Sequence, residues 1–108
     1  MDHSPAVEDR LRERAEKLDH IFDRIIACRV VVEAPHRHSR KGKLYNVRID
    51  LSVPGKEIVA NRNRPHDHAH EDVYVAIRDA FDAITRQLED YVRVMRGDVK
   101  SRGEPQEP

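Results

Sequence analysis

The sequence has few of the residues that form disulfides, large aromatic cores or membrane spans. Its 108 residues contain one cysteine, no tryptophan, three tyrosines and two phenylalanines. A single cysteine excludes an internal disulfide, and no apolar run approaches the roughly 18 residues of a membrane span or resembles a secretory leader. We therefore expect one domain over residues 1–97 in a reducing, cytoplasmic compartment, followed by a flexible tail over 98–108.

The chain also has no excess charge of either sign, since twenty lysine and arginine residues balance twenty aspartate and glutamate residues. Attraction to nucleic acid would have to arise from local segregation of charge, so the zero total neither supports nor excludes RNA as a partner. The charged fraction of 37% and the hydrophobic fraction of 38% are typical of a chain that folds with crowded charge on its surface.

Two segments have apolar residues at helical spacing. The first begins at the helix-start signal Ser4-Pro5, where serine can accept an unpaired N–H and proline needs no donor, and it is expected to reach about Asp23. The second follows a loop from Arg62 to Ala69 and is expected from about His70 to Gly97. Its apolar stripe comprises Val73, Ile77, Ala80, Ile84, Leu88, Tyr91 and Met95.

Three runs between these helices predict strands. Residues 25–34 are rich in apolar and β-branched side chains, and their later part alternates, with Cys28, Val30, Val32 and Ala34 on one side and Arg29, Val31 and Glu33 on the other. Cys28 lies in the core-facing register and is expected to be a buried, inert thiol. Residues 44–53 alternate between apolar and polar side chains, and Pro54-Gly55 provides the turn into a short strand at 57–61. The sequence therefore predicts an α+β fold: an antiparallel three-stranded sheet with two helices packed on one face, in the order helix, three strands, helix.

The densest basic patch is the segment HRHSRKGK at residues 36–43, which contains no acid. Its fixed positive charges, at a predicted hairpin tip, are Arg37, Arg40, Lys41 and Lys43. Lysine and arginine gain by releasing counterions from an RNA backbone, so one interpretation is phosphate contact. The other is a polar, solvated connection, and the residues alone favour neither.

Basic side chains also form a stripe on the first predicted helix. Arg10, Arg14 and Lys17 follow one another at spacings of four and three, which places them on one side of a helix. Acidic residues form a second stripe beside it, and adjacent stripes of opposite charge are typical of an ordinary exposed helix. Taken alone, this helix favours a structural role for its charges over RNA binding.

The second predicted helix carries arginines with acidic neighbours. Arg86 lies four residues from both Asp82 and Asp90, and Glu89 lies four residues before Arg93. These spacings predict ion pairs that would occupy the arginines. Surface ion pairs contribute only about 0–1 kcal/mol, however, so an RNA phosphate could compete for Arg86 and Arg93.

The stretch RPHDHAHEDVY at residues 64–74 contains three alternating histidines, His66, His68 and His70. Alternation would align three zinc ligands on one face of a strand, which makes metal binding one hypothesis. Pro65 disfavours a central strand, and a helix from about His70 would break the common face. We therefore favour a loop leading into a helix, with Glu71 and Asp72 as helix-start residues and no bound metal or cofactor.

Short motifs occur along the chain in an order that agrees with the predicted elements. They are Met1-Asp2, Ser4-Pro5-Ala6-Val7, Arg14, Lys17-Leu18, Phe22, Val53-Pro54-Gly55, HEDVY at 70–74, Ala76-Ile77 and Arg86-Gln87-Leu88. Over roughly residues 1–96 they resemble the short type of the ribosome hibernation-promoting and ribosome-associated inhibitor family, also called sigma-factor modulation or ribosomal subunit interface proteins.

The resemblance implies a small cytoplasmic protein, without catalytic activity, that occupies the mRNA and tRNA channel of the small ribosomal subunit. There it would inhibit translation and promote the hibernation of ribosomes under stress. Members of the family meet ribosomal RNA phosphates through basic side chains on both helices and nearby loops. For this chain the resemblance favours RNA contacts at Arg14, Lys17, Arg37, Arg40, Lys41, Lys43, Arg86 and Arg93.

The chain departs from the family pattern in three places. The family opens with a β-strand, whereas only Met1 to His3 stand before the first helix, so either the start is truncated or misassigned or the sheet has an open edge. Positions often occupied by lysine in the second helix are Ala83 and Asp90. The C-terminal dimerisation domain of long members does not follow. Two alternatives stay open: a protein–protein module, including a homodimer through the sheet edge, and a metal-binding protein using the histidines.

Overall fold

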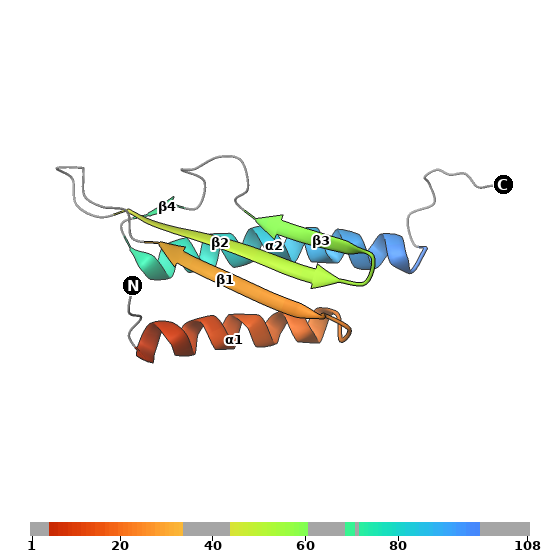
Figure 1. Ribbon diagram of the computed structural model, residues 1–108, viewed down its shortest axis with the longest axis horizontal. Coiled ribbons are helices and arrows are strands. Elements are labelled where there is room, and N and C mark those ends of the chain that lie inside the picture. Colours follow the sequence, from red (N-terminus) through yellow and green to blue (C-terminus); the bar gives the residue numbers. More distant parts are fainter. Residues whose placement is uncertain (1–4, 34–43, 61–68, 71, 98–108) are drawn as a thin grey trace.

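In the described part of the chain the first and last elements are helices, and the strands of one sheet lie between them (Figure 1). The computed structural model describes residues 5–33, 44–60, 69–70 and 72–97. The elements are, in chain order, α1 (Pro5–Ile21), β1 (Ala27–Glu33), β2 (Tyr45–Val53), β3 (Lys56–Ala60), β4 (Ala69–His70) and α2 (Val73–Met95). The predicted α+β fold and its order of helix, three strands and helix are confirmed, and the two-residue strand β4 is added.

The central strand of the antiparallel sheet is β2. β1 pairs with it along its whole length, Ala27–Glu33. On its other side β2 pairs with β4 near its start and with β3 over residues 49–53. β1 is thus an outer strand, and within the described part of the chain no strand pairs with its second edge. The edge therefore presents backbone groups that another strand could pair with.

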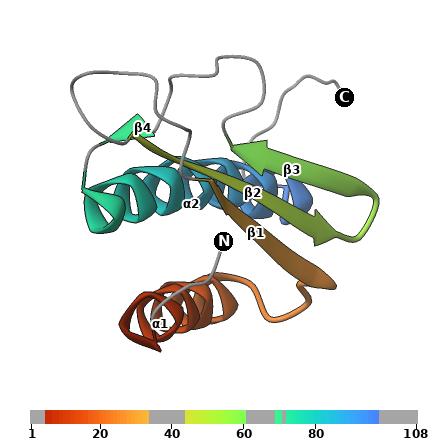
Figure 2. The same cartoon turned by 60° about the vertical axis from the view of Figure 1, so that its left-hand side comes forward.

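The two sides of β2 differ as the alternation predicts. Its core-facing residues, Val47, Ile49, Leu51 and Val53, are buried, whereas Arg48 on the other side is exposed. α2 packs on β2 and β3, and α1 packs on α2 (Figure 2). The apolar stripe of α2 is buried from Ile77 to Leu88, but Met95 is 38% exposed because little covers the last turn of the helix. Neither of the described helices is long and apolar enough to cross a membrane.

α2 begins at Val73, later than the sequence predicts, because His70 belongs to β4. Asp72 caps the helix: its side-chain oxygen Oδ1 accepts the N–H of Tyr74 at 2.8 Å, which confirms its predicted role at the helix start. At the other end, Gly97 has a φ of 78°, the left-handed conformation that commonly follows the last turn of a helix.

Cys28 is exposed, so the prediction of a buried thiol is wrong. The predicted register is right, because Cys28 lies opposite Leu51 and so points to the helix side of the sheet. However, β1 is the outer strand, and α1 packs mainly on α2 and leaves this part of β1 open. The thiol still loses part of its hydration, and this loss, with a smaller contribution from the negative charge of Asp19, raises the pKa of Cys28 above its ordinary value.

Candidate nucleic-acid interface

α1 and α2 run side by side and begin at the same end of the molecule (Figures 1 and 2). A ring contact links the two helical segments near each end. Near their starts, the guanidinium carbon of Arg10 lies 4.9 Å from the centre of the Tyr74 ring. Near their ends, the rings of Phe22 and Tyr91 meet edge to face, with 5.4 Å between their centres. The side of α1 that carries Arg10 therefore faces α2.

Two predicted RNA contacts, Arg14 and Lys17, follow Arg10 along this side of α1. Arg14 is half-buried and Lys17 is exposed. Neither forms an ion pair with any residue that the structure describes. One nearby acid is engaged elsewhere, since a carboxylate oxygen of Glu13 lies 3.4 Å from Nε of Arg10. Within the described part of the chain, no carboxylate therefore holds either cation.

The exposed outer surface of α2 carries Arg86 and Arg93, two helical turns apart. The predicted ion pair between Arg86 and Asp90 does not form, because Asp90 pairs with Arg93 instead. Arg86 has no ion pair with any described residue, including Asp82. The ion pairs expected at Arg86 are thus absent among the described residues, and Asp90 neutralises Arg93 instead.

β1 ends and β2 begins at the end of the molecule where the two helices start (Figure 1). The residues between them, 34–43, lie outside the described residues, and so do the predicted contacts Arg37, Arg40, Lys41 and Lys43. Their role in RNA binding stays a prediction.

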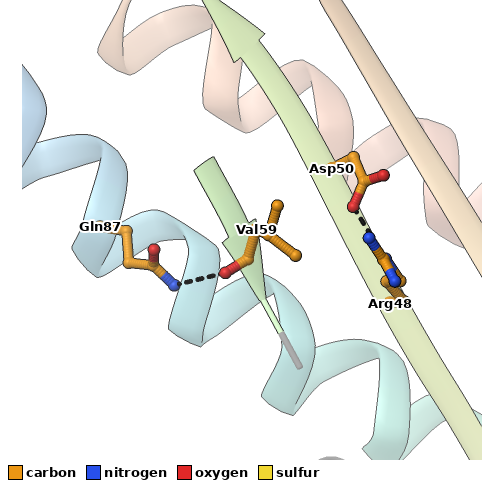
Figure 3. A network of polar contacts seen from close by, with 4 residues as sticks. All are labelled: Arg48, Asp50, Val59 and Gln87. Atoms are coloured by element: carbon orange, nitrogen blue, oxygen red, sulfur yellow. Dashed lines mark hydrogen bonds and ion pairs between the residues drawn. The ribbon is translucent and has the colours of Figure 1, made fainter. Parts of the chain in front are cut away.

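The helix-free face of the sheet has a different charge arrangement (Figure 3). Nε of Arg48 donates to Oδ1 of Asp50 at 2.9 Å, and the Asp50 side chain is only 16% exposed. Arg29, on β1, lies directly opposite Asp50. Figure 3 also shows Nε2 of Gln87 donating to the carbonyl oxygen of Val59 at 3.1 Å, which ties α2 to β3. The central-strand arginine of this face is therefore paired, whereas Arg14, Lys17 and Arg86 on the helices have no ion pair to a described residue.

The alternating histidines do not form a metal site in the described part of the chain. His66 and His68 lie outside it, and His70 pairs through its backbone with β2. No group of three or more histidine, cysteine, aspartate or glutamate side chains that could hold a metal ion occurs among the described residues. The structure gives the metal hypothesis no support.

The contact between Arg10 and Tyr74 is the feature of this surface that sequence reasoning missed. Arg10 was recognised as part of a basic stripe and Tyr74 as part of the HEDVY motif, but their contact depends on the two helices running in the same direction. One signal could have revealed it. If each successive element reverses direction, two helices separated by three strands run in parallel, and their first turns lie at the same end.

Comparison with known proteins agrees with this architecture. Residues 1–96 match the family described as Sigma 54 modulation protein / S30EA ribosomal protein. The chain is also similar to the ribosome hibernation promoting factor of Azotobacter vinelandii, with 31% identity over 88 residues that cover 82% of this chain and 71% of that relative. The chain therefore belongs to the Sigma 54 modulation protein / S30EA ribosomal protein family.

Proposed function

We propose that this protein binds the small ribosomal subunit through ribosomal RNA, occupies the mRNA and tRNA channel, and inhibits translation in the cytoplasm without catalysing a reaction. Membership of the family and the similarity to a ribosome hibernation promoting factor support a role in ribosome modulation. The observation that carries the RNA-binding step is the set of cations on the helices, Arg14, Lys17 and Arg86, without an ion pair to any described residue.

Unpaired cations are suited to phosphate contact for a physical reason. A lysine or arginine that has no carboxylate partner loses no ion pair when it meets an RNA phosphate. Each contact releases counterions condensed on the RNA, and this release supplies a large part of the binding free energy. Arg93 and Arg48 would instead have to exchange Asp90 and Asp50 for the phosphate.

Co-sedimentation with purified small ribosomal subunits over a salt series tests the proposal. The variant that combines Arg14→Gln, Lys17→Gln and Arg86→Gln removes three unpaired charges. Loss of three phosphate contacts should make the slope of log K against log salt shallower by about 2 to 3. The matched control combines Arg12→Gln, Arg29→Gln and Lys56→Gln, which removes the same charge from other surfaces and should leave the slope nearly unchanged.

Two further measurements address the channel and the inhibition. Loading the subunits with mRNA and tRNA beforehand should prevent binding of the native protein. In a cell-free translation reaction the native protein should reduce protein synthesis. The triple variant of Arg14, Lys17 and Arg86, called the helix variant, should leave synthesis at the level seen without added protein. Absence of binding at low salt would contradict the proposal, as would equal loss of binding in the helix variant and its control.

A second candidate function is pairing of two copies through the free edge of β1. The observation that favours it is the outer position of this strand in the described sheet. Antiparallel pairing centred on Val31 would place Arg29 of one copy opposite Glu33 of the other and so add two charge pairs. Sedimentation equilibrium should then show a dimer that Arg29→Glu weakens and the double variant Arg29→Glu, Glu33→Arg restores. A monomer at all concentrations would exclude it.

A further inference from the structure

We propose that Arg10 and Tyr74 together bind an unpaired nucleotide of RNA, with the base stacked on the tyrosine ring and the phosphate held by the arginine. The inference rests on the proposed function and deepens it by naming single-stranded RNA as the ligand class of this end of the molecule. Aromatic stacking combined with arginine contact is the usual means by which proteins hold unpaired bases.

Tyr74 differs from the other aromatic residues in what surrounds its ring. Phe22 and Phe81 are buried, at 7% and 2% exposure. Tyr45 and Tyr91 are half-buried and pack against the hydrophobic core. Tyr74 is also half-buried, but it is not among the side chains that pack against the described core, and one face of its ring is covered by a charged group. Among the described aromatic residues, its ring is therefore the one that contacts a charged group without packing against the core.

The group covering the ring is planar and cationic. The guanidinium carbon of Arg10 lies 4.9 Å from the ring centre, within the distance at which a cation is attracted to the face of an aromatic ring. A guanidinium plane and a nucleobase are both flat groups that lie on such a face. The space above Tyr74 therefore already accommodates a ligand of the required shape.

Weak contacts hold Arg10 over the ring. Its ion pair with Glu13 is 3.4 Å long, and the two side chains are 41% and 66% exposed. A pair this exposed contributes little to stability, and so does an exposed cation–π contact. A phosphate offers arginine two charge-assisted hydrogen bonds in their place. Arg10 can thus move to a phosphate while the base takes its position above Tyr74.

The surroundings favour a nucleotide chain over an isolated nucleotide. Arg14 lies four residues after Arg10, about 6 Å further along the same side of α1, and has no ion pair to a described residue. An RNA strand whose base rests on Tyr74 would place its following phosphates along α1. The unpaired arginine there can bind one of them.

Fluorescence anisotropy tests the site, with a short labelled single-stranded RNA and the same RNA annealed to its complement. Tyr74→Leu should weaken binding of the single strand by a factor between about 5 and 150, without changing the salt slope, because stacking is lost and no charge is removed. Tyr74→Phe should bind as the native protein does. Arg10→Gln should weaken binding and make the slope shallower by about 0.7. Binding of the duplex should not respond to Tyr74→Leu, because its bases are already stacked.

The chain contains a matched control at the other end of the helices. The guanidinium carbon of Arg24 lies 5.4 Å from the centre of the Phe22 ring, but that ring is buried and packs on Tyr91. Arg24→Gln removes the same charge and the same type of contact at a ring that belongs to the buried core. It should leave the preference for single-stranded over duplex RNA at its native value.

The possible outcomes separate this inference from the proposed function. Suppose that the native protein binds small subunits, and that Tyr74→Leu binds single-stranded RNA as tightly as the native protein does. The nucleotide site is then wrong and the proposed function stands. If the native protein binds neither RNA nor subunits, both are wrong. Tyr74→Leu could weaken binding simply by destabilising the fold, which a lower melting temperature would reveal. In that case Tyr74→Phe and Arg10→Gln test the site instead. If Arg10→Gln binds single-stranded RNA as tightly as the native protein does, the site is contradicted.

Discussion

The two faces of the central strand β2 differ in how they use their side chains. On one face, Ile49 and Leu51 are fully buried beneath α2. On the other, Arg48 and Asp50 form an ion pair on a surface that neither α1 nor α2 covers. The buried face attaches the helices, and the helices carry unpaired cations such as Arg14. Among the described residues, the zero net charge of the chain therefore includes a paired arginine on the central strand and, on the helices, three cations without an ion pair, Arg14, Lys17 and Arg86.

The largest difference between the two faces should appear in stability. Leu51→Ala removes a fully buried side chain and should lower the free energy of unfolding by about 2–5 kcal/mol. Ser52→Ala, the next residue on the opposite face, should change it by less than about 0.5 kcal/mol. Urea denaturation followed by circular dichroism measures both. Similar losses in the two variants would break the distinction between the faces.

The next largest effect concerns the first turn of α2, the helix that covers the buried face. Asp72→Ala removes the side-chain oxygen that accepts the N–H of Tyr74 and should cost about 0.5–2 kcal/mol. Asp82→Ala, an exposed change inside the same helix, is the control and should be nearly neutral. The same denaturation measurement applies, and an equal loss in both variants would rule out a capping role.

Most of the fold could be predicted from the sequence, because a helix or strand that buries one face has apolar residues at a regular spacing. The alternation along β2 and the helical stripe of α2 from Ile77 to Leu88 are such signals, and both are confirmed. β4 could not be predicted, since two residues have no period and their pairing depends on where the loop meets the start of β2. The observed start of α2 at Val73 is later than the predicted start at about His70, because His70 belongs to β4.

The residue types of the candidate interface could be predicted, but their pairing could not. The choice of Asp90 between Arg86 and Arg93 is decided by side-chain conformations whose energies differ by a few tenths of a kcal/mol. The contact between Arg10 and Tyr74 depends on the relative direction of two helices that are far apart in the sequence. Spacing within one element cannot show either.

A smaller effect should separate the two arginine environments. The ion pair between Arg48 and Asp50 is partly exposed, so a double-mutant cycle with Arg48→Ala and Asp50→Ala should give a coupling of about 0–1 kcal/mol. Salt should reduce this coupling, because counterions screen exposed charges. Urea denaturation at low and high salt checks it. A coupling well above this range would mean that the helix-free face contributes to stability as much as a buried contact does.

The smallest effect tests how far the helical cover extends over β1. Cys28 points to the helix side but is exposed, and loss of hydration followed by the charge of Asp19 raises the pKa of its thiol. A negative charge disfavours the thiolate, so Asp19→Asn should lower the pKa of Cys28 and increase the thiolate fraction at any pH below that value. The rate of alkylation by iodoacetamide should rise by at most a factor of about 5, with little change in stability.

The pKa of Cys28 should stay above its ordinary value in this variant, because the larger cause, partial burial against the helix side, is unchanged. A return to the ordinary value in Asp19→Asn would show that α1 acts on this strand through charge alone and does not cover it.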